Sequence, residues 1–327
     1  MHKVKLRALL CQVGELNERE LDELFDAVQK RQSATKALRV VENARWPLSC
    51  PSCHTERIVR NGRARGLQRY LCRACGRSFS ALTGTALAGV HHKERLHAFA
   101  ECMSRGASIC DTAAELKISP STALRLRHRF LNSITEHQPK ALNGMVEVDE
   151  TFFRESFKGA RKLPRESRHR GKSKPKKGAP KGPSKDLIPV LVARSRGGPY
   201  VADVVLPSLS RTDIKAALAP IVGPDTLLVA DGSGSIASAA KDLGITFEAV
   251  PTSYGGHVRG TYHVQTVNQY HSRLKGWINH ELRGVSTKHL PKYLAWMRTF
   301  AWYQDKPKPE IYLISALGKQ LINTFCA

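Results

Sequence analysis

Residues 145–153 are MVEVDETFF, and this stretch decides the class of fold. Apolar and polar residues alternate before β-branched and aromatic residues take over, a pattern that predicts a β-strand. Side-chain alternation gives the strand two faces, one with Glu147, Asp149 and Thr151 and the other with Val146, Val148 and Glu150. Two carboxylates on one strand face are costly unless a cation or solvent compensates them. The strand is therefore a candidate position for a metal site.

A second candidate carboxylate, Asp231, ends an apolar run in TLLVADGSGS, residues 226–235. Enzymes built on open sheets commonly hold catalytic side chains at the carboxyl edge of a strand. An Asp-Gly pair at a strand end is also an ordinary turn, so Asp231 by itself leaves a purely structural role open.

The region around these two residues is rich in strand patterns. Four segments are typical of strands: LIPVLVAR (187–194), YVADVVLP (200–207), TLLVADG (226–232) and TFEAVPT (246–252). Helical patterns fall at about 211–219, 235–243, 263–282 and 288–303. This order predicts a mixed sheet covered by helices, which we assign to a catalytic domain over residues 145–305, followed by a C-terminal tail over 306–327.

A strongly basic segment interrupts this domain just after its first strand. Residues 154–185 hold 13 Lys and Arg against two Glu, a local net charge of +11. Such a composition cannot bury a core, and we expect a mobile loop.

The whole chain is basic as well. Its 327 residues carry 52 Lys and Arg against 28 Asp and Glu, a formal charge of +24. This points to a polyanionic partner, and we expect double-stranded DNA. No apolar run is long enough to span a membrane, and the N-terminal apolar stretch is too short for a signal peptide. We therefore expect a cytoplasmic or nucleoid-associated protein without a membrane partner.

Residues 1–45 have the pattern of a helical lead-in. Apolar residues recur at helical spacing, namely Leu16, Leu21, Leu24, Phe25 and Val28. Asn17 is a candidate N-cap for the main helix.

Residues 46–82 contain two CxxC pairs, Cys50 with Cys53 and Cys72 with Cys75, separated by 18 residues. This spacing is typical of a zinc ribbon, in which four thiolates close the coordination of one structural Zn²⁺. His54 is not needed as a ligand because the set of four is complete. Free thiols or two reversible disulfides are the alternative. Seven Arg crowd the same segment, and either a phosphate contact or a solvated face explains them.

Residues 90–135 predict three helices, of which the last two form a helix-turn-helix. A short helix at Asp111–Lys117 is followed by a turn, and Ser119 and Pro120 stand at the N-cap and first position of the next helix. This second helix would present its DNA-binding residues to base edges and phosphates, namely Ser121, Thr122, Arg125, Arg127 and Arg129. An ordinary helical hairpin is the alternative, because the turn lacks the glycine often found there.

Several blocks in one order resemble bacterial insertion-sequence transposases of the ISXO-like group, which have an N-terminal zinc ribbon and helix-turn-helix. The blocks are FSALTGTALAG, VEVDETFF, ADGSGSIASAAKDLGI and HVQTVNQYHSRLKGWI. The resemblance implies a multidomain α+β protein with a ribonuclease H-like mixed-sheet catalytic domain, whose first metal ligand is Asp149 and whose second is Asp231.

The third catalytic position departs from the commoner pattern of such enzymes, which place a Glu on a following helix. Here Asn268 stands 37 positions after Asp231, and Lys275 follows seven residues later. The resemblance thus implies a catalytic set of Asp149, Asp231, Asn268 and Lys275, the first three as ligands of Mg²⁺ or Mn²⁺. Because the amide oxygen of Asn is a weaker ligand than a carboxylate, Glu147 or Glu150 is a candidate to supplement it. His263, Glu248 and Glu281 are weaker candidates, for which a structural role is expected.

On a helix, Asn268, His271 and Lys275 share one stripe, beside an apolar stripe made by Val264, Val267, Leu274 and Ile278. The polar stripe is predicted to face the metal pocket. Two divalent cations would then support cleavage at the element's ends and strand transfer into target DNA. A homo-oligomer on DNA is expected, since two ends must be joined.

Two other functions fit parts of the sequence. A ribbon and a helix-turn-helix would suffice for a DNA-binding transcription regulator, and an inactive transposase relic could keep the fold without ligand geometry. Asp149 and Asp231 argue against a regulator, which has no need of them.

Overall fold

The computed structural model describes residues 2–44, 49–64, 66–91, 93–139, 141–166, 186–250 and 258–318. These residues divide into two compact units, one of residues 1–133 and 308–321 and the other of 134–307 and 322–327. Most of the basic segment, residues 167–185, lies outside the described residues, so the expectation of a mobile loop stays open there.

The first unit begins with two helices, α1 (His2–Val13) and α2 (Glu18–Ala44). Asn17 and Glu20 cap α2 reciprocally: each backbone N–H donates to the other's side chain at 3.0 Å. This is the capping-box arrangement, and it confirms the predicted helical lead-in and its cap. Leu21, Phe25 and Val28 on α2 are exposed.

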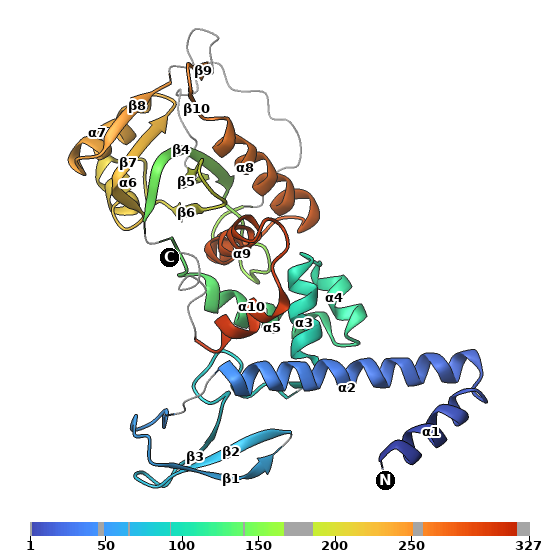
Figure 1. The fold of residues 1–327 in the computed structure, drawn as a ribbon. Coiled ribbons are helices and arrows are strands. Elements are labelled where there is room, and N and C mark those ends of the chain that lie inside the picture. The colour runs from blue at the N-terminus through green and yellow to red at the C-terminus, as the bar shows by residue number, and fades with distance from the viewer. Residues whose placement is uncertain are drawn as a thin grey trace. The chain divides into compact units, whose positions relative to one another are not determined.

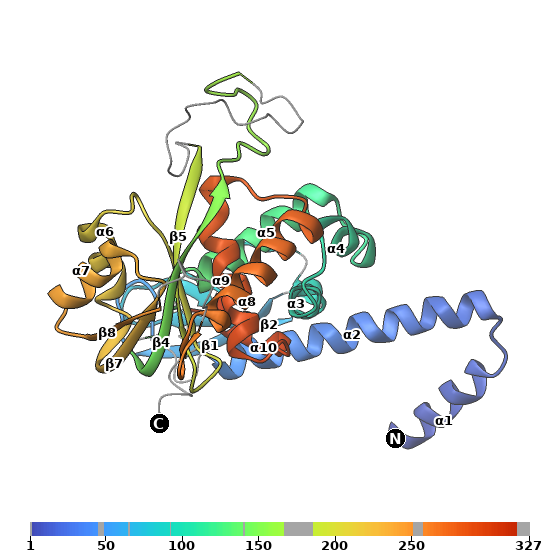
Figure 2. The same ribbon diagram turned by 90° about the horizontal axis from the view of Figure 1, so that it is seen from above.

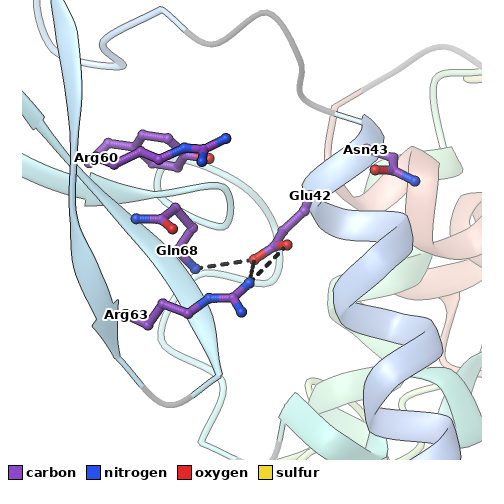
Figure 3. A pocket seen from close by; sticks show the side chains of 6 residues that line it. Glu42, Asn43, Arg60, Arg63 and Gln68 are labelled. Atoms are coloured by element: carbon purple, nitrogen blue, oxygen red, sulfur yellow. Dashed lines mark hydrogen bonds and ion pairs between the residues drawn. The ribbon is translucent and has the colours of Figure 1, made fainter.

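A small three-stranded antiparallel sheet follows, in the order β1 (Ile58–Ala64), β2 (Leu67–Cys72) and β3 (Ser78–Ser80). Its core is no more than a few side chains, with Tyr70 stacked on Phe79 beside Cys50 and Cys72. Glu42 of α2 accepts hydrogen bonds from Arg63 and from the backbone of Gln68 at 3.1–3.3 Å, at one side of a hollow of about 560 Å³ (Figure 3). So small a core predicts dependence on a metal ion.

The helices that complete this unit are η1 (Lys93–Arg95), α3 (Leu96–Ser104), α4 (Ile109–Glu115), α5 (Pro120–Ile134) and α10 (Pro309–Ala316). Ser119 accepts from the backbone of Thr122 and so caps α5, as the sequence predicts. The turn before it needs no glycine, because Lys117 itself takes a positive φ of 51°. The predicted C-terminal tail is partly wrong: α10 is helical and buries Tyr312 and Leu313 in this unit.

The second unit is a five-stranded mixed sheet in the order β6-β5-β4-β7-β8 (Figure 1). Its strands are β4 (Leu142–Arg154), β5 (Leu187–Ser195), β6 (Val201–Val205), β7 (Val222–Ala230) and β8 (Thr246–Ala249). β4, β5 and β6 are antiparallel neighbours, whereas β7 and β8 run parallel to β4. The predicted mixed sheet covered by helices is thus confirmed.

Helices lie on both faces of this sheet (Figure 2). On one face, α6 (Arg211–Leu218) and α7 (Gly234–Asp242) pack on an apolar core that includes Val146 and Val148. The other face carries α8 (Gln265–Gly276), continued by η2 (Trp277–Glu281), then η3 (Thr287–His289) and α9 (Leu290–Trp302). A two-stranded ribbon, β9 (Val258–Arg259) with β10 (Tyr262–His263), precedes α8.

Candidate functional site

The four cysteines of the two CxxC pairs come together in the first unit, with their sulfur atoms within 4.8 Å of one another. The Sγ atoms of Cys50 and Cys75 are 3.7 Å apart, and those of Cys53 and Cys72 are 3.6 Å apart. Ligands about 2.3 Å from a tetrahedral Zn²⁺ are separated by about 3.8 Å, whereas a disulfide requires about 2.05 Å. The cluster therefore fits zinc and excludes the disulfide alternative in this structure.

The loops around the cysteines are preorganised for that role. Backbone N–H groups of Ser52 and Cys75 point at the sulfurs of Cys50 and Cys72 at 3.4 and 3.5 Å. Such N–H groups stabilise thiolates. His54 is exposed and has a positive φ of 57°, and the four-cysteine set is complete without it.

The acidic cluster lies in the second unit, where β7 ends beside the longer strand β4. Glu147 pairs with Val229 in a parallel register, so two residues further on Asp149 comes level with Asp231. Carboxylate oxygens of Asp149, Glu150 and Asp231 all lie within 4.8 Å of one another. Two strands that are distant in sequence thus supply one cluster of charge.

The surroundings of this cluster disfavour its negative charge. Burial, followed by the charge of Asp231, raises the pKa of Asp149 to about 7. The same two causes raise the pKa of Glu150. A group of ionised carboxylates held in such a place is stabilised by a bound cation. These residues consequently fit a divalent metal ion.

Helix α8 covers one side of the cluster. Nδ1 of His271 is 3.6 Å from an Asp149 carboxylate oxygen, and the charge of Lys275 acts on both side chains. Asn268 is exposed one turn before His271. The apolar stripe predicted beside them, Val264, Val267, Leu274 and Ile278, is buried. The predicted apolar stripe of α8 is therefore confirmed as buried, and His271, predicted only to share the polar stripe, contacts the cluster directly.

Glu147 takes a different place from its neighbour Asp149. Its side chain is fully buried and accepts from Nε of Arg196 at 2.6 Å. The other carboxylate oxygen accepts from the backbone N–H groups of Thr266 and Val267, in the first turn of α8, at 2.8 and 3.0 Å. His263 lies 3.2 Å from the same side chain. Glu147 therefore anchors α8, so the expectation that it supplements the metal ligands is wrong.

The arginines expected to bind DNA on α5 have unequal positions. Arg125 is exposed, as is Ser121 beside it. Arg127 is 1% exposed, and its guanidinium donates to the Ala107 carbonyl and to Thr112. The prediction that Arg127 contacts DNA is therefore wrong, because its side chain is buried among the helices of the first unit. Arg129 is exposed but donates to the carbonyl of Ala88 at 2.6 Å.

Among the described residues, no helix combines the length and apolarity required to cross a bilayer.

Comparison with known proteins identifies the class of this protein. The family model described as ISXO2-like transposase domain matches residues 141–302, and the zinc-ribbon model described as InsA N-terminal domain matches residues 44–76. The first of these models describes a transposase domain, and the second matches the segment with the two CxxC pairs.

A relative supports this assignment over most of the chain. An uncharacterized protein in transposable element ISH50 of Halobacterium salinarum is 30% identical over 266 residues, which cover 80% of this chain and 88% of that protein. The chain belongs to the ISXO2-like transposase family. A solved structure of a simian T-cell lymphotropic virus intasome in complex with PP2A regulatory subunit B56 gamma covers 62% of this chain and 64% of its own. That likeness has 12% identity and a TM-score of 0.28, too low to carry a structural argument.

Proposed function

We propose that this protein is the DNA transposase of an insertion sequence, which binds the terminal inverted repeats and catalyses metal-dependent strand cleavage and strand transfer. The observation that carries the proposal is the position of Asp149 level with Asp231, where β7 ends beside β4 in the mixed sheet. Membership of a transposase family supports DNA strand cleavage and transfer as the reaction at this pair of carboxylates. We assign the sheet to the ribonuclease H-like class on the same grounds.

The catalytic residues proposed are Asp149, Asp231, Asn268 and Lys275. Asp149, Asp231 and Asn268 would hold Mg²⁺ or Mn²⁺, whose chemistry is to stabilise the attacking and leaving oxygens of an in-line displacement. Lys275, one turn beyond His271 on α8, would bind the terminal phosphate. The burial of Asp149 and its neighbours keeps bulk water from screening these charges.

Recognition of DNA is assigned to the first unit. Ser121, Thr122 and Arg125 lie on the first turns of α5 and are the proposed contacts to base edges, with Arg129 near the backbone phosphates. The zinc ribbon, with one bound Zn²⁺ per chain, would add phosphate contacts through its arginines. The basic segment 154–185 would add sequence-independent affinity that falls as salt rises. A homo-oligomer on DNA completes the proposal.

The test is an assay with purified protein, Mn²⁺ and DNA that carries the element's own ends. We expect cleavage at the ends and joint molecules with a target plasmid, both of which need the added metal. If the protein binds the ends but produces neither product at any divalent metal concentration, the enzymatic assignment is wrong, and a DNA-binding regulator or an inactive relic explains the chain.

A further inference from the structure

The proposed metal site has an unusual shortage of negative charge. Its third position, Asn268, contributes a neutral amide, so Asp149 and Asp231 alone would carry −2 against two divalent cations. Mg²⁺ and Mn²⁺ are held chiefly by carboxylate oxygens and water. A further carboxylate near these two aspartates would relieve the shortage.

We infer that Glu150 is the third carboxylate ligand of this site. It supplies the negative charge that the neutral side chain of Asn268 lacks. The inference rests on the proposed function, because it concerns the same metal ions.

Strand alternation places Glu150 on the face of β4 opposite to Asp149. The end of β7 explains how Glu150 still reaches the same site. Asp149 faces α8, and Glu150 shares the opposite face of β4 with Val146 and Val148. β7 ends at Ala230, so β4 loses its parallel neighbour at this level. Side chains from both faces of β4 can then approach Asp231 at the strand end, and the three sets of oxygens lie within 4.8 Å.

The turn after β7 orients Glu150 toward the cluster. Ser233 donates its hydroxyl to Oε1 of Glu150 at 3.4 Å, and its backbone N–H donates to Oδ1 of Asp231 at 3.3 Å. One residue thus holds both carboxylates. Glu147, by contrast, has both of its oxygens occupied by Arg196 and by the first turn of α8.

A buried histidine beside the cluster points independently to a missing ligand. His271 is 6% exposed and its ring lies against Asp149, with Nδ1 3.6 Å from the carboxylate. Its Nε2 has no hydrogen-bond partner within the part of the chain that the structure describes. Buried polar atoms are rarely left unpaired. A buried imidazole with an unpaired nitrogen thus lies directly against the cluster.

The experiment is a titration with Mn²⁺ of the full-length protein that keeps its ribbon zinc but holds no other divalent metal. It is done without DNA, and binding is measured by the loss of the free-ion EPR signal. Glu150→Gln is expected to weaken Mn²⁺ binding at least tenfold, as are Asp149→Asn and Asp231→Asn. Asn268→Ala should weaken it less than threefold. Glu281→Gln, an exposed Glu at the end of η2, is the matched control and should bind like wild type.

Folding is checked by the melting of each zinc-loaded variant without Mn²⁺. Glu150→Gln should melt no lower than wild type, because it removes one of three neighbouring like charges. Glu150→Asp keeps the charge on a shorter side chain and should lose less affinity than Glu150→Gln. If Glu150→Gln binds Mn²⁺ within twofold of wild type while both Asp variants lose it, the inference is overturned and the proposed function stands. If the two Asp variants also bind normally, the proposed metal site itself is wrong.

Discussion

The four-cysteine cluster and the acidic cluster are both fitted to metal ions, but they arise in opposite ways. The cysteines come from two short loops around a sheet with few core residues, and their sulfurs already have the spacing of a tetrahedral site. The carboxylates come from the middle of β4 and from the residue that follows β7, inside a well-packed unit. The ribbon is expected to need its metal ion to fold, whereas the sheet of the second unit is expected to fold without one and to position the carboxylates of the proposed metal site.

The two clusters differ in whether a substrate can reach the metal ion, as well as in how the metal ion affects folding. Four thiolates fill the coordination of Zn²⁺ and leave no place for a substrate. The acidic cluster has three carboxylates at an open strand end, so bound water or a phosphate could complete its metal ions. Removing the metal should therefore have opposite structural consequences in the two regions.

The largest expected effect is the loss of the ribbon on removal of zinc. Zinc binding to small domains of this kind contributes about 10–16 kcal/mol of apparent free energy, so Cys72→Ser or chelation should unfold residues 49–80. Hydrogen exchange would show loss of protection in this segment and retention in the sheet of the second unit. Cys110→Ser, at an exposed single cysteine, is the control. Protection that persists in a zinc-free ribbon would contradict the comparison.

The next largest effect is expected at Glu147, which supports the acidic site without belonging to it. Glu147→Ala should lower the free energy of unfolding by about 3–5 kcal/mol, because Arg196 and the first turn of α8 lose a buried partner. Urea denaturation measures the change, with Glu281→Ala as the exposed control. A loss below about 1 kcal/mol would mean that α8 is held by its apolar face alone.

Two arginines on α5 separate packing from DNA binding. Arg125→Ala should leave stability unchanged and weaken binding to the element's ends by about 1–3 kcal/mol. Arg127→Ala should instead destabilise the unit by about 1–3 kcal/mol, because the part-buried Ala107 carbonyl and the buried Thr112 hydroxyl lose their donor. Thermal melting and fluorescence anisotropy with labelled DNA test the pair. If Arg127→Ala weakens DNA binding without loss of stability, Arg127 contacts the DNA and the prediction is wrong.

The smallest expected effect is a gain in stability in the metal-free acidic site. Asp231→Asn removes a charge that raises the pKa of both Asp149 and Glu150, so the metal-free variant should melt about 2–4 °C higher than wild type. Added Mn²⁺ should raise the melting temperature of wild type but not of the variant. An equal response to Mn²⁺ in both proteins would separate the cluster from the metal.

How far the sequence predicts these regions depends on the range of the interactions. The CxxC spacing is a local signal, and it predicts the four ligands of the ribbon. Asp149 and Asp231 are predicted from their places in and after strand patterns. Glu147 and Glu150 could not be told apart, because the partner of Glu147 is the backbone of α8 more than 100 residues away. The burial of Arg127 is a tertiary effect of the same kind. The approach of His271 to Asp149 was signalled only by its place on the polar stripe of α8.

Whether the acidic cluster carries the reaction is decided by strand transfer by Asp231→Asn under single-turnover conditions. Wild type and variant are compared at equal occupancy of DNA that carries the element's ends, in Mn²⁺. Asp231→Asn is expected to bind DNA normally and to join ends at a rate at least about 1,000-fold lower, equivalent to about 4 kcal/mol of transition-state stabilisation. Equal rates for the two proteins would contradict it.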